Sequence, residues 1–226
     1  SALNIASYVI CVSQYVKDRL EQLGLNYPKN TIIHNPININ KFPLLNREEL
    51  RDSRRDEKKI VFFSGVYMPL RKKRLDLLLR AFSTNTYLRE KCKLVILTGK
   101  EGISYAKEFV SQKKIDALVL NPRPVSEIVR YYNIANVFVM PSILEAFGLT
   151  YIEALSVGTP VVGFHGTLKE IECLLGIYIG EKFDPSHEGK EKLAQKIVKV
   201  LNTDFDRKLL RRKVIENLSW DARFKE

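Results

Sequence analysis

The chain has 226 residues, of which 45% are hydrophobic and 28% charged, with a formal net charge of +11. This length suits one domain with short appendages, and the composition can fill a hydrophobic core. The longest apolar runs, such as residues 60–63, are far too short to span a bilayer, which excludes a transmembrane helix. The three cysteines lack metal-ligand spacing and are odd in number, so we expect reduced thiols and a cytoplasmic protein.

The excess of lysine and arginine over aspartate and glutamate indicates an anionic partner. The lysines and arginines are spread along the chain, without an RNA-reading aromatic motif or a helix-turn-helix pattern, so we predict no nucleic-acid partner. A basic face would be attracted to anionic headgroups, which leaves peripheral contact with the inner face of the membrane open.

In chain order, residues 8–13 suggest a strand, and an amphipathic stretch follows it to Leu23. Residues 46–59 are polar and charged, as expected of an exposed linker. Strand patterns then alternate with helical ones, which predicts a Rossmann-like α/β fold, a parallel sheet with helices on both faces. The expected strands lie near residues 60–64, 94–98, 118–120, 137–140, 160–164 and 177–179.

The loops that follow these strands lie at the carboxyl edge of the sheet, where ligands bind in such folds. Residues 99–102, Gly-Lys-Glu-Gly, lack the spacing of a phosphate-binding loop, and we expect a turn there. His165 follows the strand at 160–164, and we expect it in a surface turn.

The segment from residue 141 to residue 163 reads as loop, helix and strand after the apolar strand at 137–140. A helix that starts near Phe147 would leave the N–H groups of Phe147, Gly148 and Leu149 without intrahelical partners, and we call these three groups the amide cradle. Anions bind at such helix starts, and Gly148 would let the backbone approach a diphosphate closely.

Two carboxylates flank the amide cradle. Glu145 precedes it, and Glu153 lies roughly 7 to 8 Å along the helix axis beyond it. Carboxylates accept hydrogen bonds from vicinal hydroxyls, so we interpret Glu145 as the sugar-side group and Glu153 as the ribose-side group of a nucleotide-sugar site. The alternative is two glutamates on a solvated helix face.

These residues resemble the donor-binding signature of GT-B glycosyltransferases of the GT4 type, the glycosyl transferases group 1. The shared frame is Pro-Ser, Glu-x-Phe-Gly-Leu, Glu-Ala and Gly-x-Pro-Val-Val, with seven residues between the glutamates. Further similar segments follow in the family's order, at residues 8–13, 32–42, 59–65, 75–82 and 218–220. The resemblance implies a retaining hexosyltransferase that transfers sugar from a nucleotide-diphosphate donor to an acceptor hydroxyl of a lipid-linked or polysaccharide glycan.

The resemblance also implies basic ligands for the diphosphate. Lys73 aligns with the family's phosphate-binding lysine, and Gly65 with the glycine that ends the first strand. The family arginine after that glycine is replaced by Val66, so Arg71 is the candidate substitute and Arg74 a weaker one. A solvated basic turn is the alternative for this loop.

The nucleobase would lie near residues 121–125, where Val125 is the expected contact and Arg123 a weaker one. A rigid proline-braced turn is the alternative. We expect no cofactor and no metal, because Asp204-Phe-Asp206 reads as a helix boundary rather than a metal motif.

A GT-B enzyme has two Rossmann-like domains, and this sequence holds one of them. We therefore expect residues 1–45 to be a remnant of the N-terminal domain with the interdomain segment, 60–217 the nucleotide-sugar domain, and 218–226 the start of the crossing helix. The missing N-terminal domain, on the same chain or a split subunit, is an expected partner, and turnover by the isolated piece is not expected. A non-catalytic nucleotide-sugar-binding or scaffold domain, and a GT-B phosphorylase or epimerase, remain alternatives.

Overall fold

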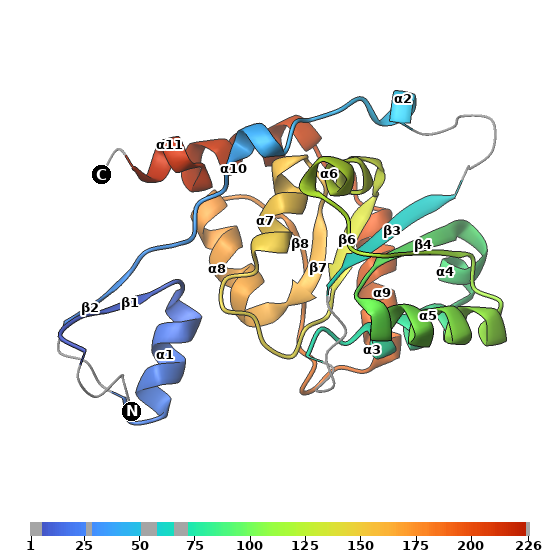
Figure 1. The fold of residues 1–226 in the computed structure, drawn as a ribbon, viewed down its shortest axis with the longest axis horizontal. Helices are drawn as coiled ribbons and strands as arrows, with labels where there is room; N and C mark the ends of the chain where they lie inside the picture. Colours follow the sequence, from blue (N-terminus) through green and yellow to red (C-terminus); the bar gives the residue numbers. More distant parts are fainter. Residues whose placement is uncertain (1–5, 26–28, 51–57, 66–71, 225–226) are drawn as a thin grey trace.

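A computed structural model describes residues 6–25, 29–50, 58–65 and 72–224. Its centre is a six-stranded parallel sheet in the order β5-β4-β3-β6-β7-β8 (Figure 1). The strands are β3 (Lys59–Ser64), β4 (Cys92–Leu97), β5 (Ala117–Leu120), β6 (Val137–Met140), β7 (Val161–Phe164) and β8 (Gly180–Phe183). The predicted Rossmann-like fold is confirmed.

The central strands are buried because their sequences are continuously apolar, as a sheet covered on both faces requires. Residues 60–64 of β3 and all of β6 are buried. Phe62 of β3 lies edge-on to Phe138 of β6, with ring centroids 5.7 Å apart, and to Tyr132 at 5.1 Å. This aromatic cluster fixes the centre of the sheet against the helices on one face.

Helices cover both faces of the sheet (Figure 1). On one face, α3 (Leu75–Thr84) and α4 (Thr86–Lys91) pack with α9 (Lys190–Leu201), and α5 (Lys100–Lys113) packs with α3. On the other face lie α6 (Val125–Ile134), α7 (Leu149–Ser156), α8 (His165–Leu175) and α10 (Arg207–Leu218), followed by α11 (Trp220–Arg223).

The N-terminal segment forms a separate small unit, β1 (Val9–Cys11) paired in parallel with β2 (Asn30–Ile32), with α1 (Gln14–Gln22) between them. Figure 1 shows it beside α8, and the backbone N–H of Gln14 donates to Glu170 of α8 at 2.7 Å. The connection to β3 runs through η2 (Ile39–Lys41) and α2 (Arg47–Leu50), and Ile37 forms a parallel bridge with Ser219.

Three local expectations are wrong. The strand expected at 177–179 begins at Gly180, whose φ of +135° lets it approach the carbonyl of Val161; an added Cβ would lie 1.9 Å from that oxygen. The apolar residues 177–179 precede β8, which lies at the edge of the sheet and is partly exposed. Gly99 precedes helix α5 and does not form a turn, and His165 is the first residue of α8.

Candidate functional site

Residues 72 and 73, just before α3, meet the loop after β6 at the carboxyl edge of the sheet. The N–H of Ile143 donates to the carbonyl of Lys72 at 2.9 Å, which places these two segments side by side. As a result the ammonium of Lys73 forms an ion pair with the buried carboxylate of Glu145. Gly65 leaves room for the side chain of Lys73, because a Cβ at position 65 would lie 3.3 Å from Cγ of Lys73. Three predicted site residues, Gly65, Lys73 and Glu145, are therefore brought together.

Helix α7 begins at Leu149, two residues later than predicted. Phe147 is inserted into the protein interior, where its ring lies 5.0 Å from that of His34. Gly148 then turns the chain with a φ of 70°, in the left-handed region that favours glycine. A Cβ on Gly148 would also lie 2.4 Å from the ring of Tyr151. The buried phenylalanine and the left-handed glycine together delay the helix.

In the part of the chain that the structure describes, the three N–H groups of the amide cradle remain free although the helix starts later than predicted. Within the described residues, the N–H groups of Phe147, Gly148 and Leu149 donate to no protein acceptor. The carbonyls just before them are held: Thr167 donates to that of Glu145 at 3.2 Å, and Ser13 to that of Ala146 at 2.5 Å. A trans peptide directs its C=O and N–H oppositely, so the bond from Ser13 also directs the N–H of Phe147. The N–H of Phe147 is thus oriented before any ligand binds.

Tyr151 of α7 ties the ends of two strands together, a role that the sequence did not reveal. Its hydroxyl donates to the carbonyl of Met140 at 2.6 Å and accepts from the N–H of Phe164 at 3.0 Å. Burial, reinforced by the charge of Glu145, raises the pKa of Tyr151 far above its ordinary value, so the phenol stays protonated. Gly163 leaves room for this ring, since a Cβ there would lie 2.3 Å from the hydroxyl oxygen.

Glu153 lies one turn into α7 and is half-buried. Its Oε2 accepts a hydrogen bond from the hydroxyl of Tyr132 in α6, at 2.7 Å. Burial raises the pKa of Glu153, while the bond from Tyr132 opposes that shift. Sequence reasoning missed this contact between Tyr132 and Glu153, because nothing in the local pattern distinguishes Tyr132 from a core tyrosine.

The remaining basic candidates are placed differently. Arg71 lies outside the described residues. Arg74 has a left-handed φ of 52° at the start of α3, and its Nε is 3.2 Å from Oδ1 of the buried Asp76. Arg123 pairs with Glu127 of α6, 3.7 Å away. Its guanidinium is therefore engaged along α6.

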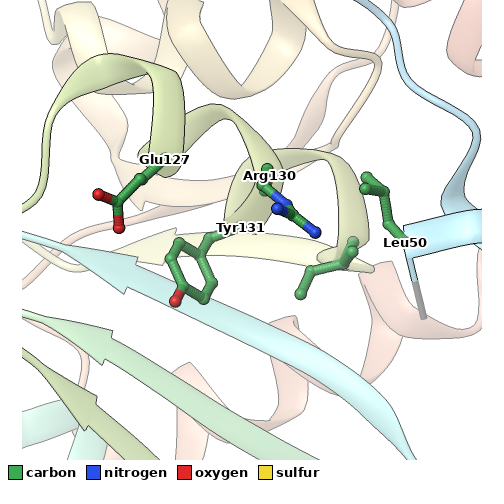
Figure 2. A pocket seen from close by; sticks show the side chains of 5 residues that line it. Leu50, Glu127, Arg130 and Tyr131 are labelled. Atoms are coloured by element: carbon green, nitrogen blue, oxygen red, sulfur yellow. The ribbon is translucent and has the colours of Figure 1, made fainter. Parts of the chain in front are cut away.

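Val125 is the first residue of α6 and lies 42% exposed at the edge of a cavity of about 480 Å³. The other residues that line it are Asn40, Lys41, Pro43, Leu45, Ser126 and Val129. A second cavity, of about 360 Å³, opens farther along α6, where Leu50 of α2 lies across from Tyr131 and Arg130 (Figure 2). Both cavities follow the surface of α6 beside the connecting segment.

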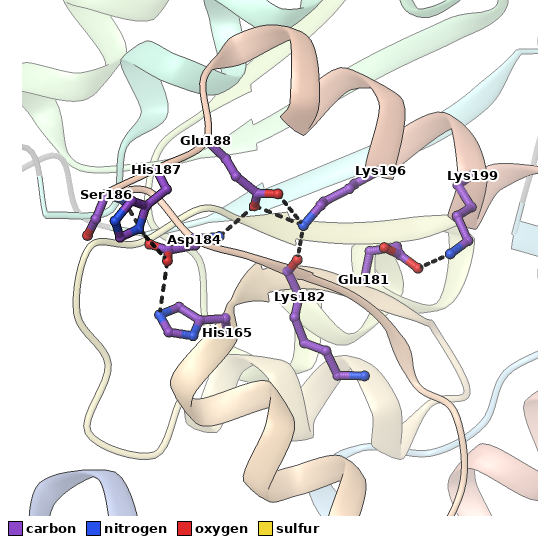
Figure 3. Close-up of polar contacts among 9 residues, drawn as sticks. All are labelled: His165, Glu181, Lys182, Asp184, Ser186, His187, Glu188, Lys196 and Lys199. Atoms are coloured by element: carbon purple, nitrogen blue, oxygen red, sulfur yellow. Dashed lines mark hydrogen bonds and ion pairs between the residues drawn. The ribbon is translucent and has the colours of Figure 1, made fainter. Parts of the chain in front are cut away.

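Another polar cluster lies at the carboxyl ends of β7 and β8 (Figure 3). Asp184 is 2.9 Å from Nδ1 of His187 and 3.8 Å from Nε2 of His165. The hydrogen bond with His187 is the main cause that lowers the pKa of Asp184. Among the described residues no group of three or more His, Cys, Asp and Glu is arranged to hold a metal ion. Asp206 accepts from the N–H of Leu209 at 2.9 Å, which confirms the helix boundary predicted at residues 204–206.

In the described part of the chain, no helix combines the length and apolar character that crossing a bilayer requires.

The sequence is similar to parts of several curated proteins. Alpha-monoglucosyldiacylglycerol synthase of Streptococcus pneumoniae is 29% identical over 203 residues, which are 85% of this chain and 44% of that protein. D-inositol 3-phosphate glycosyltransferase of Thermobifida fusca is 35% identical over 98 residues, 38% of this chain and 23% of that protein. The chain thus spans less than half the length of these relatives.

Solved structures share the fold. Sucrose-phosphate synthase of Thermosynechococcus elongatus superposes with a TM-score of 0.77 at 20% identity, covering 97% of this chain and 56% of that one. Anabaena Alr3699/HepE, solved in complex with UDP and glucose, gives 0.74 at 18% identity, covering 96% and 61%. Both share the fold, and both chains extend well beyond the part matched here.

The profile of the family described as Glycosyl transferases group 1 matches residues 46–218, a span from the connecting segment to the end of α10. It contains the ion pair of Lys73 and Glu145, the amide cradle and Glu153. Because this match covers most of the sequence, the chain belongs to the glycosyl transferases group 1 family.

Proposed function

We propose that this chain is the donor-binding part of a retaining hexosyltransferase of the GT4 type. It would bind a nucleotide-diphosphate sugar and transfer the sugar to an acceptor hydroxyl of a lipid-linked or polysaccharide glycan. An N-terminal GT-B domain, on the same chain or a separate subunit, would supply the acceptor site, so turnover requires both. The neighbour solved with UDP and glucose has the same fold and is consistent with such a donor.

One observation carries the proposal. Three backbone N–H groups at the start of α7 lack acceptors in the described residues. Glu145, paired with Lys73, precedes them in the chain, and Glu153 follows them one turn into α7. Free amides at a helix start favour an anion, and carboxylates on both sides favour hydroxyls at both ends of it. A sugar, a diphosphate and a ribose in that order match this arrangement.

The proposed chemistry follows from charge. When the sugar leaves, the nucleoside diphosphate gains negative charge, which the amide cradle and Lys73 stabilise without having to reorganise. Glu145 already pairs with Lys73. In this proposal its carboxylate accepts hydrogen bonds from sugar hydroxyls, so it orients the sugar and does not act as the nucleophile. The acceptor hydroxyl would attack the anomeric carbon from the face that the diphosphate leaves, as the bond from that carbon to the phosphate oxygen breaks. Its proton would pass to an oxygen of the departing diphosphate, and the sugar would retain its configuration.

Calorimetric titration with uridine, guanosine and adenosine diphosphates tests the donor site. We expect saturable binding of one of them, and Lys73→Met should weaken it about tenfold through the lost charge. Lys182→Met is the matched control, because Lys182 also pairs with a glutamate and its side chain is 29% exposed against 30% for Lys73.

Equal losses for the two lysine variants would contradict the assignment of Lys73. If none of the three diphosphates bound, the result would favour the scaffold alternative.

A further inference from the structure

The hydroxyl of Tyr132 is buried in the core and is directed at Glu153. Tyr132 is completely inaccessible to solvent, and its ring lies 5.1 Å from Phe62 and 5.3 Å from Phe138. Its carbonyl accepts from the hydroxyl of Thr159 at 2.8 Å. Both the ring and the backbone of Tyr132 are therefore fixed, so the phenol is a rigid donor.

This rigid donor sets the position of the Glu153 carboxylate. A glutamate side chain has several rotamers, and the 2.7 Å bond from Tyr132 to Oε2 selects one of them. The bond joins α6 to α7 from the side of the core. Burial raises the pKa of Tyr132 well above its ordinary value, so the phenol keeps its proton and remains the donor.

The second oxygen of the carboxylate remains available. Oε1 of Glu153 accepts no hydrogen bond from the described residues, and it is not among the buried side-chain atoms without a partner, so it reaches solvent. Glu153 lies four residues after Leu149, about 6 Å along the helix axis from the amide cradle. That separation suits a hydroxyl-bearing ring attached to a bound diphosphate.

We propose that Tyr132 is a positioning residue that holds Glu153 with one oxygen turned to the ligand, and that this pair selects ribonucleotide over deoxyribonucleotide donors. The inference rests on the proposed function and adds how the site recognises the sugar of the nucleotide. Tyr132 touches Glu153 and no part of the ligand. Its removal should therefore affect only ligands that carry ribose hydroxyls.

The test pairs one protein change with one ligand change. Tyr132→Phe keeps the buried ring and removes the hydroxyl, and each protein is titrated with the nucleoside diphosphate that the wild type binds and with its 2′,3′-dideoxy form. We expect Tyr132→Phe to weaken binding of the ribose form about tenfold, with no change for the dideoxy form. Glu153→Gln should likewise reduce the preference for the ribose form.

Tyr131→Phe is the matched control, since Tyr131 is the neighbouring tyrosine of α6 and its ring also packs on Phe62, at 5.9 Å. It should leave both affinities unchanged. Thermal unfolding of each variant without ligand identifies any loss of folded protein. Equal weakening of both ligands by Tyr132→Phe, or an unchanged preference for ribose, would overturn the role of Tyr132 and leave the donor site standing. If the wild type binds no nucleoside diphosphate, the proposed function fails and this inference fails with it.

Discussion

Lys73 and Glu145 lie 72 residues apart in the sequence and form an ion pair at the carboxyl edge of the sheet. The carboxylate is buried, while the side chain of Lys73 is 30% exposed. The pair forms because the bond from Ile143 to Lys72 holds the residues just before α3 against the loop after β6, and β3 and β6 are adjacent strands of the sheet. It places a cation beside the amide cradle.

Removal of Lys73 should therefore also reduce stability. Lys73→Met leaves the carboxylate of Glu145 buried without its partner, and the free energy of unfolding should fall by about 1–2 kcal/mol, a modest value because Lys73 is partly exposed. Urea unfolding near neutral pH measures it. In the double variant with Glu145→Gln the loss should be smaller than the sum of the two single losses, and strict additivity would show that the two groups do not interact.

Replacement of Gly148 should be costly for two separable reasons. Gly148→Ala must adopt a left-handed φ of 70°, and its Cβ would meet the ring of the buried Tyr151 at 2.4 Å. Gly176→Ala isolates the first reason, since Gly176 has a φ of 64° with nothing within 4 Å of the added Cβ. We expect a loss of about 1–2 kcal/mol for Gly176→Ala from backbone strain and about 1–3 kcal/mol more for Gly148→Ala. Equal losses in thermal unfolding would exclude the steric contribution.

Tyr151→Phe should loosen the carboxyl edge of the sheet. It removes the bonds to the carbonyl of Met140 and from the N–H of Phe164, and leaves both buried backbone groups without that partner. The free energy of unfolding should fall by about 2–4 kcal/mol, measured with urea. Tyr131→Phe serves as control, with an expected change of less than about 0.5 kcal/mol, because its hydroxyl makes no hydrogen bond in the described residues. Similar values for the two variants would contradict the bridging role of Tyr151.

The half-buried carboxylate of Glu153 should make stability depend on pH. Burial raises its pKa in the folded state above the ordinary value of 4.5, so the folded protein holds the proton more tightly than the unfolded chain. The stabilising contribution is fully present below the unfolded pKa and is lost as pH rises through the folded pKa.

Glu153→Gln does not titrate at this position. Relative to this variant, the wild type should lose stability as pH rises from about 4 towards neutrality. Urea unfolding of both proteins across that range measures the difference. A constant difference, or one that grows in favour of the wild type, would show that burial does not govern the pKa of Glu153.

The amino-acid pattern was sufficient to predict the parallel sheet and the loops at its carboxyl edge. Continuous apolar runs such as 60–63 and 137–140 indicate buried parallel strands. Their alternation with helical patterns indicates the α/β fold class. Boundaries were less predictable. The start of α7 depends on the burial of Phe147 beside His34, a contact between residues 113 positions apart by sequence number. The residues near Phe147 in the sequence do not include His34, so the local pattern could not predict where α7 starts.

Some features of the candidate site could likewise be predicted from the sequence, and others could not. Local patterns were enough to predict a strand, loop and helix with free amides at the helix start and carboxylates before and after them, because helix starts and residue spacing are local properties. The folded chain alone shows that Lys73 pairs with Glu145, that Tyr132 hydrogen-bonds to Glu153, and that Tyr151 joins β6 to β7. Each of these contacts joins side chains to groups on another element, and their geometry exists only when helices pack on the sheet.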